Sequence, residues 1–267
     1  MGEDSLLVGG WREVSLVDVL EHVSFTLWLA LCNLRCPWCS NARLARGVGA
    51  KPVSVERLGE VVKGSSAFVE VFHVTGGEPL IQFRQLRALL ERVRGEVGLP
   101  LSLDTNGTLP ERLKELAPLL YHVAIDVKAP LSNPALYALA AGISREAAEA
   151  VVESVRRSIE AALSVPFLEL RTTLVPGLLT GRDVVEVARS LEEYAERARG
   201  RVVFVVQQFI PYEGVEGEFA RRPAAPPEEV RRAASLVAEG TRMEVYYRTI
   251  EEGARKLARR AAAQGRG

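Results

Sequence analysis

Short apolar runs alternate with amphipathic segments along most of this chain of 267 residues. Runs that are apolar throughout suit strands of a parallel sheet whose two faces are both buried. Such strands are predicted at Ser24–Leu31, Phe68–Val74, Leu99–Leu103, His122–Val127, Phe167–Leu174, Val202–Phe209 and Met243–Thr249. Helices are predicted at Val55–Lys63, Gln82–Glu96, Pro110–Leu119, Arg145–Leu163, Asp183–Arg199 and Pro226–Glu239. The repeated β–α order predicts an α/β fold, either a doubly wound sheet or an α/β barrel.

Composition limits the classes of protein that such a fold can serve. Hydrophobic residues make up 48% of the chain, which excludes an intrinsically disordered protein. The 34 basic residues balance 34 acidic ones, so bulk charge gives no case for a nucleic-acid partner. The apolar segment Val23–Leu31 is shorter than the roughly 20 residues that span a bilayer, and its acidic flank does not fit a signal peptide. We therefore expect a cytoplasmic protein with no membrane partner.

The domain organisation follows from the absence of any repeat or low-complexity linker in the sequence. We expect one domain over residues 1–267, with a core at about 20–212 and a C-terminal helix and strand extension at 226–267. The Arg- and Ala-rich tail after Glu251 is predicted to be a solvated helix with a frayed end.

Polar or glycine-rich residues follow each of the first six predicted strands. In folds of this class the chemistry lies at the carboxyl ends of the strands. The strand ends are, in chain order, the cysteine cluster 32–39, Thr75–Pro79, Asp104–Gly107, Asp126–Lys128, Val175–Gly177 and Gln207–Pro211. We expect these segments to meet at one rim, which is where the functional site is predicted to lie.

Cys32, Cys36 and Cys39 are the three cysteines of the chain, and they lie within eight residues. An odd number fits no closed disulfide framework, so we expect metal-ligating thiolates in a reducing compartment. An iron–sulfur cube normally has four cysteine ligands. With three, one iron is left open to a substrate or cofactor. Two other interpretations are a zinc loop completed by His or Asp and a ferredoxin-like electron carrier.

The spacing Cys32-x3-Cys36-x2-Cys39 after a first strand resembles the signature of the radical S-adenosylmethionine (SAM) superfamily. The resemblance implies a partial (β/α)6 TIM-like barrel with a parallel sheet, and a [4Fe-4S] cluster held by these three cysteines. It also implies SAM on the open iron, cleaved by the reduced cluster to a 5′-deoxyadenosyl radical. Gly76-Gly77-Glu78-Pro79 is similar to the GGEP motif, whose backbone and Glu contact the SAM amino group. Trp38 stands where the superfamily places an aromatic residue against the adenine.

Two further strand ends resemble the activating enzymes of glycyl-radical enzymes, such as pyruvate formate-lyase activase and the anaerobic ribonucleotide reductase activases. Those enzymes carry D-T-N-G and D-x-K, which are matched here by residues 104–107 and 126–128. The resemblance implies catalytic roles for Asp126, which orients the SAM amino end, and Lys128, near the site of hydrogen abstraction. The implied SAM-contacting residues are Trp38, Gly76, Gly77, Glu78, Asp104, Thr105, Asn106, Asp126 and Arg171. A monovalent cation beside the SAM carboxylate is associated with Asp104, Thr105 and Asp126.

Composition favours a functional role for these residues, although turn and helix-cap roles are the alternative. The chain has 29 Glu and only five Asp, and two of the five are Asp104 and Asp126. Lys128 is likewise one of five Lys among 34 basic residues, so a compact ammonium is expected to be required there.

The leading hypothesis is therefore an activase that installs a glycyl radical on a pyruvate formate-lyase-like enzyme or an anaerobic ribonucleotide reductase. A flavodoxin or ferredoxin-type protein would donate the electron. The alternative is a radical SAM enzyme for a small molecule or nucleoside, similar to 7-carboxy-7-deazaguanine synthase; a non-enzymatic iron–sulfur or zinc protein is a remote third. Departures from the activase pattern concern the partner: Ser40 replaces a common His, and Glu213 stands where pyruvate formate-lyase activase has a SAM-contacting His.

Overall fold

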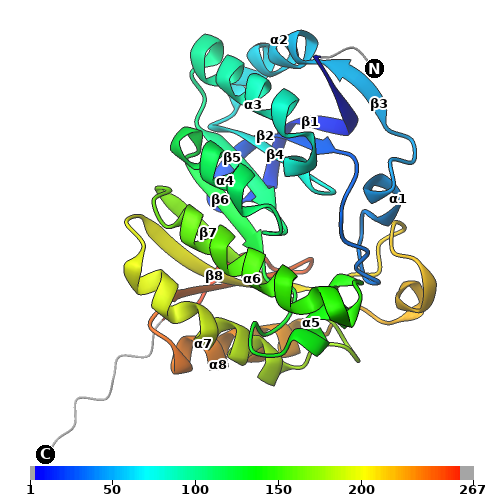
Figure 1. Ribbon diagram of the computed structural model, residues 1–267. Coiled ribbons are helices and arrows are strands. Elements are labelled where there is room, and N and C mark those ends of the chain that lie inside the picture. The colour runs from blue at the N-terminus through cyan, green and yellow to red at the C-terminus, as the bar shows by residue number, and fades with distance from the viewer. Residues whose placement is uncertain (1–3, 259–267) are drawn as a thin grey trace, which may run out of the picture.

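The computed structural model describes residues 4–258, which form one ten-stranded sheet and eight α-helices (Figure 1). The strands are β1 (Ser5–Val19), β2 (His22–Leu29), β3 (Lys51–Ser54), β4 (Val71–Gly76), β5 (Leu101–Thr105), β6 (His122–Asp126), β7 (Phe167–Leu174), β8 (Arg201–Gln208), β9 (Glu244–Thr249) and β10 (Gly253–Lys256). The helices are α1 (Ala42–Ala45), α2 (Val55–Ser65), α3 (Phe83–Arg92), α4 (Pro110–Leu116), α5 (Pro134–Ala141), α6 (Arg145–Ala162), α7 (Gly181–Arg197) and α8 (Pro227–Gly240).

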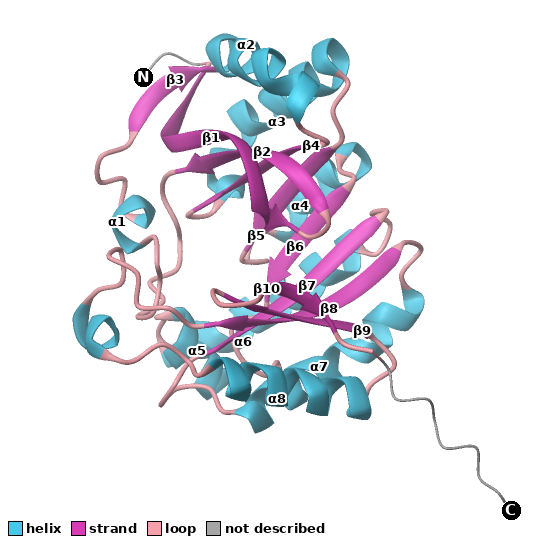
Figure 2. Cartoon of the chain, turned by 180° about the vertical axis from the view of Figure 1, so that it is seen from behind, coloured by secondary structure: helices cyan, strands magenta, loops and turns pink. Residues whose placement is uncertain are grey.

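The sheet is curved into a half-barrel with helices on its outer side (Figure 2). The strand order is β10-β9-β8-β7-β6-β5-β4-β2-β1-β3, and every pairing from β2 to β9 is parallel. β1 pairs antiparallel with β2 and β3, and β10 pairs antiparallel with β9. The two ends of the sheet do not pair with each other, so the barrel is open between β1–β3 and β10. This is the partial parallel barrel that the motif resemblance implies, one of the two folds left open by the β–α order.

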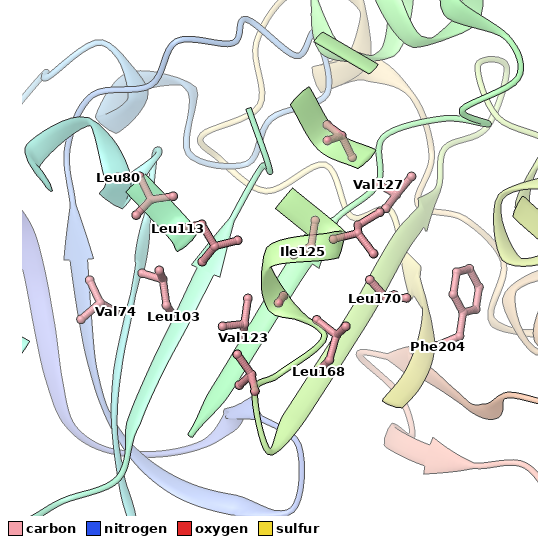
Figure 3. Packing of buried hydrophobic residues seen from close by; sticks show 14 of the residues in the cluster. Val74, Leu80, Leu103, Leu113, Val123, Ile125, Val127, Leu168, Leu170 and Phe204 are labelled. Atoms are coloured by element: carbon pink, nitrogen blue, oxygen red, sulfur yellow. The ribbon is translucent and has the colours of Figure 1, made fainter. Parts of the chain in front are cut away.

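The main core lies between the sheet and the outer helices. Because successive strand residues point to opposite faces, Val123 and Ile125 of β6 and Leu168 and Leu170 of β7 all belong to this core (Figure 3). A smaller apolar cluster of other residues comprises Leu20, Phe167, Val203, Val205 and Tyr246. Leu20, in the turn between β1 and β2, therefore packs against residues of β7, β8 and β9.

The sequence places the parallel strands correctly but misses both ends of the sheet. Each predicted strand overlaps an observed one, including the one at Met243–Thr249. The strand predicted from Phe68 begins instead at Val71, and the Phe68 side chain is exposed in a short 3-10 turn. The sequence does not predict strands β1 and β3 or helices α1 and α5.

The tail prediction is wrong where it can be compared. Residues Gly253–Lys256 form strand β10 on the edge of β9 rather than a solvated helix. The rest of that predicted helix, from residue 259, lies outside the described residues. Between residues 4 and 258, no helix combines the length and the apolar character needed to cross a membrane.

Candidate active site

The three cysteines lie on the loop that follows β2, and all three line a cavity of about 1080 Å³. The C-terminal end of α5 holds this loop in place. The backbone N–H of Arg35 donates to the carbonyl of Ala141 at 3.0 Å, and the Trp38 indole N–H donates to the carbonyl of Ala140 at 3.0 Å. The position of the cysteines therefore depends on a helix more than 100 residues later in the chain.

Gly142 explains why α5 can approach the loop so closely. It ends the helix in the left-handed region, at φ +64°, and a Cβ there would lie 1.8 Å from the carbonyl oxygen of Arg35. Gly214 packs in the same way against the carbonyl of Ser40, also at 1.8 Å for an added Cβ. Sequence reasoning missed both glycines because neither belongs to a recognisable motif.

Burial raises the pKa of all three thiols, that of Cys36 to about 12. The free enzyme therefore holds protonated thiols at neutral pH, and metal binding must displace their protons. In the part of the chain that the structure describes, no three His, Cys, Asp or Glu side chains surround a common point as ligands of one ion would.

The glycine-rich turn after β4 packs directly on the backbone of the cysteine loop. A Cβ on Gly76 would lie 2.1 Å from the carbonyl oxygen of Leu29, and one on Gly77 would lie 2.1 Å from that of Leu31. The Glu78 N–H donates to the same Leu31 carbonyl at 2.7 Å. The glycines are thus required by contact between two protein segments, whereas the sequence suggested only a close approach to a ligand.

Glu78 lies behind this turn and is completely buried. Its carboxylate accepts from the Thr105 hydroxyl at 3.0 Å and from the backbone N–H of Asn106 at 2.7 Å. Burial raises the pKa of Glu78 to about 7. Glu78 does not line the cavity, and its hydrogen bonds connect the end of β4 to the end of β5. The two glycines are the part of the motif that faces the cavity.

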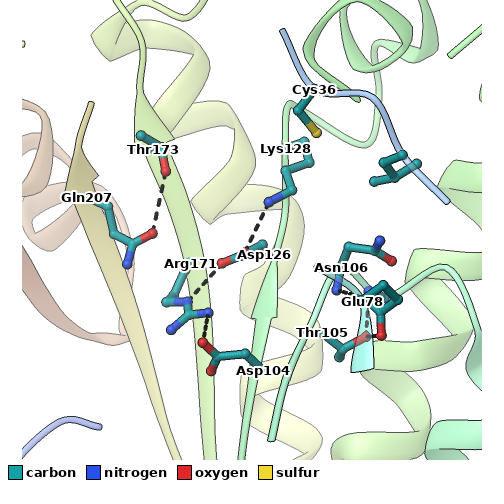
Figure 4. Close-up of polar contacts among 12 residues, drawn as sticks. Cys36, Glu78, Asp104, Thr105, Asn106, Asp126, Lys128, Arg171, Thr173 and Gln207 are labelled. Atoms are coloured by element: carbon teal, nitrogen blue, oxygen red, sulfur yellow. Dashed lines mark hydrogen bonds and ion pairs between the residues drawn. The ribbon is translucent and has the colours of Figure 1, made fainter. Parts of the chain in front are cut away.

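Four charged side chains, from β5, from the end of β6 and the loop after it, and from the middle of β7, form one connected group (Figure 4). Arg171 bridges Asp104 and Asp126, with both N–O distances at 2.8 Å, and Lys128 Nζ lies 3.0 Å from Asp126. Burial alone would raise the pKa values of both carboxyls, but Arg171 outweighs it and lowers them. Lys128 also lies over the Trp38 ring, 5.1 Å from its centroid. The structure thus brings Trp38 and these four predicted residues together around the cavity.

Thr105 does not join this group, because adjacent residues of a strand point to opposite faces. Its hydroxyl donates to Glu78 and accepts from the Gly107 N–H at 3.1 Å. Arg171 already supplies the positive charge between Asp104 and Asp126. The Thr105 hydroxyl thus points to Glu78, and the cation site at Asp104, Thr105 and Asp126 stays a prediction.

A buried polar layer lies beneath the charged group and was not predicted. The Ser102 hydroxyl oxygen lies 2.7 Å from Nδ1 of both His73 and His122, and His122 Nε2 lies 3.5 Å from Glu169 Oε2. Burial lowers the pKa of His122, so its ring is neutral at pH 7. These residues sit inside predicted apolar strands, where a polar side chain needs a partner. The presence of a polar residue inside each of these apolar runs was the signal that could have revealed the layer.

Comparison with known proteins identifies the family. The fold and the site define a class of α/β proteins with an open parallel barrel and three thiols on one loop at the carboxyl ends of the strands. The profile of the radical SAM superfamily matches residues 29–191. The chain belongs to the radical SAM superfamily.

Similar proteins differ in how much of the chain they cover. A Methanocaldococcus jannaschii protein, provisionally named a glycyl-radical enzyme activating enzyme, is 28% identical over 86% of this chain and 91% of its own length. The 7-carboxy-7-deazaguanine synthase of Hyperthermus butylicus is 37% identical over 40% of this chain and 44% of its own length. A solved structure of TYW1 with a lysine-pyruvate adduct bound has a TM-score of 0.60 at 15% identity, covering 86% of this chain and 77% of that one, which shows a shared fold.

Membership of this family implies a [4Fe-4S] cluster and SAM, and the residues present fit both groups. Three part-buried thiols from one loop, with no other cysteine in the chain, match a cube with one open iron. The cavity in front of them is lined by Gly76 and Gly77 and carries charges of both signs at Asp126 and Lys128. A zwitterionic amino acid moiety could be bound by such a set.

Proposed function

We propose that this protein installs a glycyl radical on a partner enzyme. When bound, the cluster and SAM supply a 5′-deoxyadenosyl radical, which takes one hydrogen atom from a glycine Cα and leaves as 5′-deoxyadenosine. The observation that carries the proposal is likeness over nearly the whole chain to the Methanocaldococcus jannaschii protein. The matches to 7-carboxy-7-deazaguanine synthases from Hyperthermus butylicus and Thermococcus kodakarensis cover 44% and 46% of those proteins.

The residues of the charged group have distinct roles in this proposal. Gly76 and Gly77 offer backbone groups to the SAM amino end, and Asp126 orients that end as a carboxylate acceptor. Arg171 keeps Asp104 and Asp126 ionised, because its guanidinium nitrogens lie 2.8 Å from an oxygen of each carboxylate. Trp38 covers the adenine. Lys128, held by Asp126 and over Trp38, stands beside the hydrogen to be abstracted.

The mouth of the cavity supports a macromolecular substrate. Tyr212 and Ile250, which follow the carboxyl ends of β8 and β9, line the cavity, yet they are 52% and 63% exposed. Large exposed apolar side chains beside a cavity are a feature of interaction sites. A protein loop carrying the target glycine would cover them. A flavodoxin or ferredoxin-type donor and a cytoplasmic location complete the proposal.

The test begins with anaerobic reconstitution with iron and sulfide, followed by reduction with dithionite in the presence of SAM. We expect 5′-deoxyadenosine by chromatography from the wild type and none from Cys39→Ala. A recombinant anaerobic ribonucleotide reductase and a pyruvate formate-lyase are then added separately. A glycyl-radical doublet in the electron paramagnetic resonance (EPR) spectrum of either one is the expected result. Product without a radical on either partner would contradict the activase role.

A second candidate is an enzyme that acts on a purine-related small molecule. It is favoured by the 37% identity to the Hyperthermus butylicus 7-carboxy-7-deazaguanine synthase over 107 residues, which exceeds the identity to the provisionally named activating enzyme. This candidate predicts that 5′-deoxyadenosine formation rises when the small substrate is added and does not respond to either protein partner.

A further inference from the structure

The three cysteine sulfurs have different hydrogen-bond surroundings. Cys32 Sγ accepts from the backbone N–H of Leu34 at 3.4 Å and from the side-chain amide of Asn106, with Nδ2 at 3.7 Å. Cys39 has a backbone donor, Asn41, while Cys36 Sγ lies 3.6 Å from a carbonyl oxygen, that of Ala141. Within residues 4–258, Cys32 is thus the cysteine whose sulfur accepts a hydrogen bond from a side chain.

The orientation of the Asn106 amide is fixed by its other contacts. Its Oδ1 accepts from the backbone N–H of Thr108 at 3.0 Å, and a backbone N–H can only donate. Nδ2 must therefore point the other way, towards Cys32 and towards Asn33 Oδ1 at 3.0 Å. Asn33 Nδ2 in turn donates to the Thr108 hydroxyl at 2.7 Å, and that hydroxyl donates to Asn106 Oδ1 at 2.6 Å. The three side chains form a closed ring of hydrogen bonds.

The backbone anchors the same residue to the strand ends. The Asn106 N–H donates to Glu78 at 2.7 Å, and the side chain is buried, with 6% of the residue exposed. Asn106 is therefore rigidly placed beside a cluster ligand before any cofactor binds. Hydrogen bonds to ligand sulfurs withdraw electron density and are one of the means by which proteins set the potential of iron–sulfur clusters.

We propose that Asn106 is a positioning residue that tunes the reduction potential of the cluster through an N–H···S bond to Cys32. The donor favours the reduced, more negative state of the cluster, so it raises the potential. A neutral amide supplies this effect without a titrating charge. The proposal rests on family membership and not on the identity of the substrate.

The test is a potentiometric titration of the reconstituted enzyme without SAM, followed by EPR. We expect Asn106→Ala to shift the midpoint potential to more negative values with unchanged iron and sulfide content. The isosteric Asn106→Asp, which replaces the donor with an anion, should shift it further. Asn33→Ala is the matched control, because it opens the same ring without removing a sulfur contact, and it should keep the wild-type potential.

Equal potentials for Asn106→Ala and the wild type would overturn the proposal. An equal shift in Asn33→Ala would also overturn it, since the effect would then come from loop geometry. Should Asn106→Ala bind too little iron for titration, resonance Raman spectra of Asn106→Asp give a second measurement. Loss of the donor should move the Fe–S(Cys) bands to higher frequency, and bands at the wild-type positions would count against the N–H···S bond.

Discussion

Two arginines on adjacent strands each bind a group of carboxylates, but at opposite ends of the sheet. Arg171 of β7 is 5% exposed in its side chain and contacts Asp104 and Asp126 at the cavity. Arg201 begins β8, is 34% exposed in its side chain, and contacts Glu21 at 2.7 Å and Glu244 at 2.5 Å. Each site pairs one arginine with two carboxylates. The sites differ in how deeply the arginine is buried and in the end of the parallel strands at which it lies.

The difference indicates that the carboxyl ends of the strands serve the chemistry and the amino ends serve stability. At the carboxyl ends of the strands, buried charge is held in place for chemistry at the cost of desolvation. At the amino ends, Arg201 ties the turn that carries Glu21 to β8 and β9, which stabilises the sheet where no chemistry is expected. The predictions below test this contrast, beginning with the largest effect.

Removing a cysteine should abolish activity with little effect on folding. We expect Cys36→Ala to lose the visible absorbance of the cluster and all 5′-deoxyadenosine formation, because one of three ligands is gone. The free energy of unfolding of the metal-free protein should change far less than in Arg171→Ala. Ser40→Ala, on the same loop, is the control and should reconstitute normally. A full iron complement in Cys36→Ala would show that the ligand assignment is wrong.

Truncating the two arginines compares the two ends directly. Arg171→Ala leaves Asp104 without its arginine and Asp126 with Lys128 alone, so the free energy of unfolding should fall by about 3–5 kcal/mol. Arg201→Ala removes a solvent-screened pair and should lower it by about 1 kcal/mol or less. Urea unfolding of the metal-free proteins measures both. Equal losses would mean that burial does not separate the two sites.

The short-range part of the site could be predicted from sequence. The cysteine loop, the glycine-rich turn and the aspartates at the strand ends are contiguous motifs, and the β–α order brings them to one rim. Strand alternation also separates Asp104 from Thr105, although the motif resemblance grouped them. The alternation was therefore the better guide to which side chains meet.

The long-range part could not be predicted in the same way. The bond from Trp38 to Ala140 joins residues 102 positions apart, and no local pattern encodes it. Gly142 follows a run of alanines and resembles an ordinary helix end. Arg201 meets Glu21 across 180 positions, so only the folded sheet reveals that pair.

Two glycines with similar backbones sharpen the contrast between the ends. Gly142 (φ +64°) supports the cysteine loop, while Gly98 (φ +78°) precedes β5 at the opposite end and has no atom within 4 Å of an added Cβ. Both Ala variants should lose about 1–2 kcal/mol from left-handed backbone strain. Gly142→Ala should in addition displace Arg35 and reduce the iron bound on reconstitution. Equal iron content in the two variants would argue against the supporting role of α5.

The smallest effect is a pH dependence at the amino end. Hydrogen bonds from Arg201 and then Tyr246 lower the pKa of Glu21 from 4.5 to about 2. A carboxyl with a lowered pKa in the folded state stabilises the protein above its unfolded value, and this contribution is lost as the pH falls from 4.5 towards 2. Because the pair is exposed, Glu21→Gln should cost less than about 1 kcal/mol at pH 7 and a smaller amount near pH 3. Urea unfolding between these pH values measures the difference. In an Arg201→Ala background the pH-dependent effect of the substitution should shrink to the part that Tyr246 supports, and an undiminished effect would mean that Arg201 does not hold Glu21 ionised.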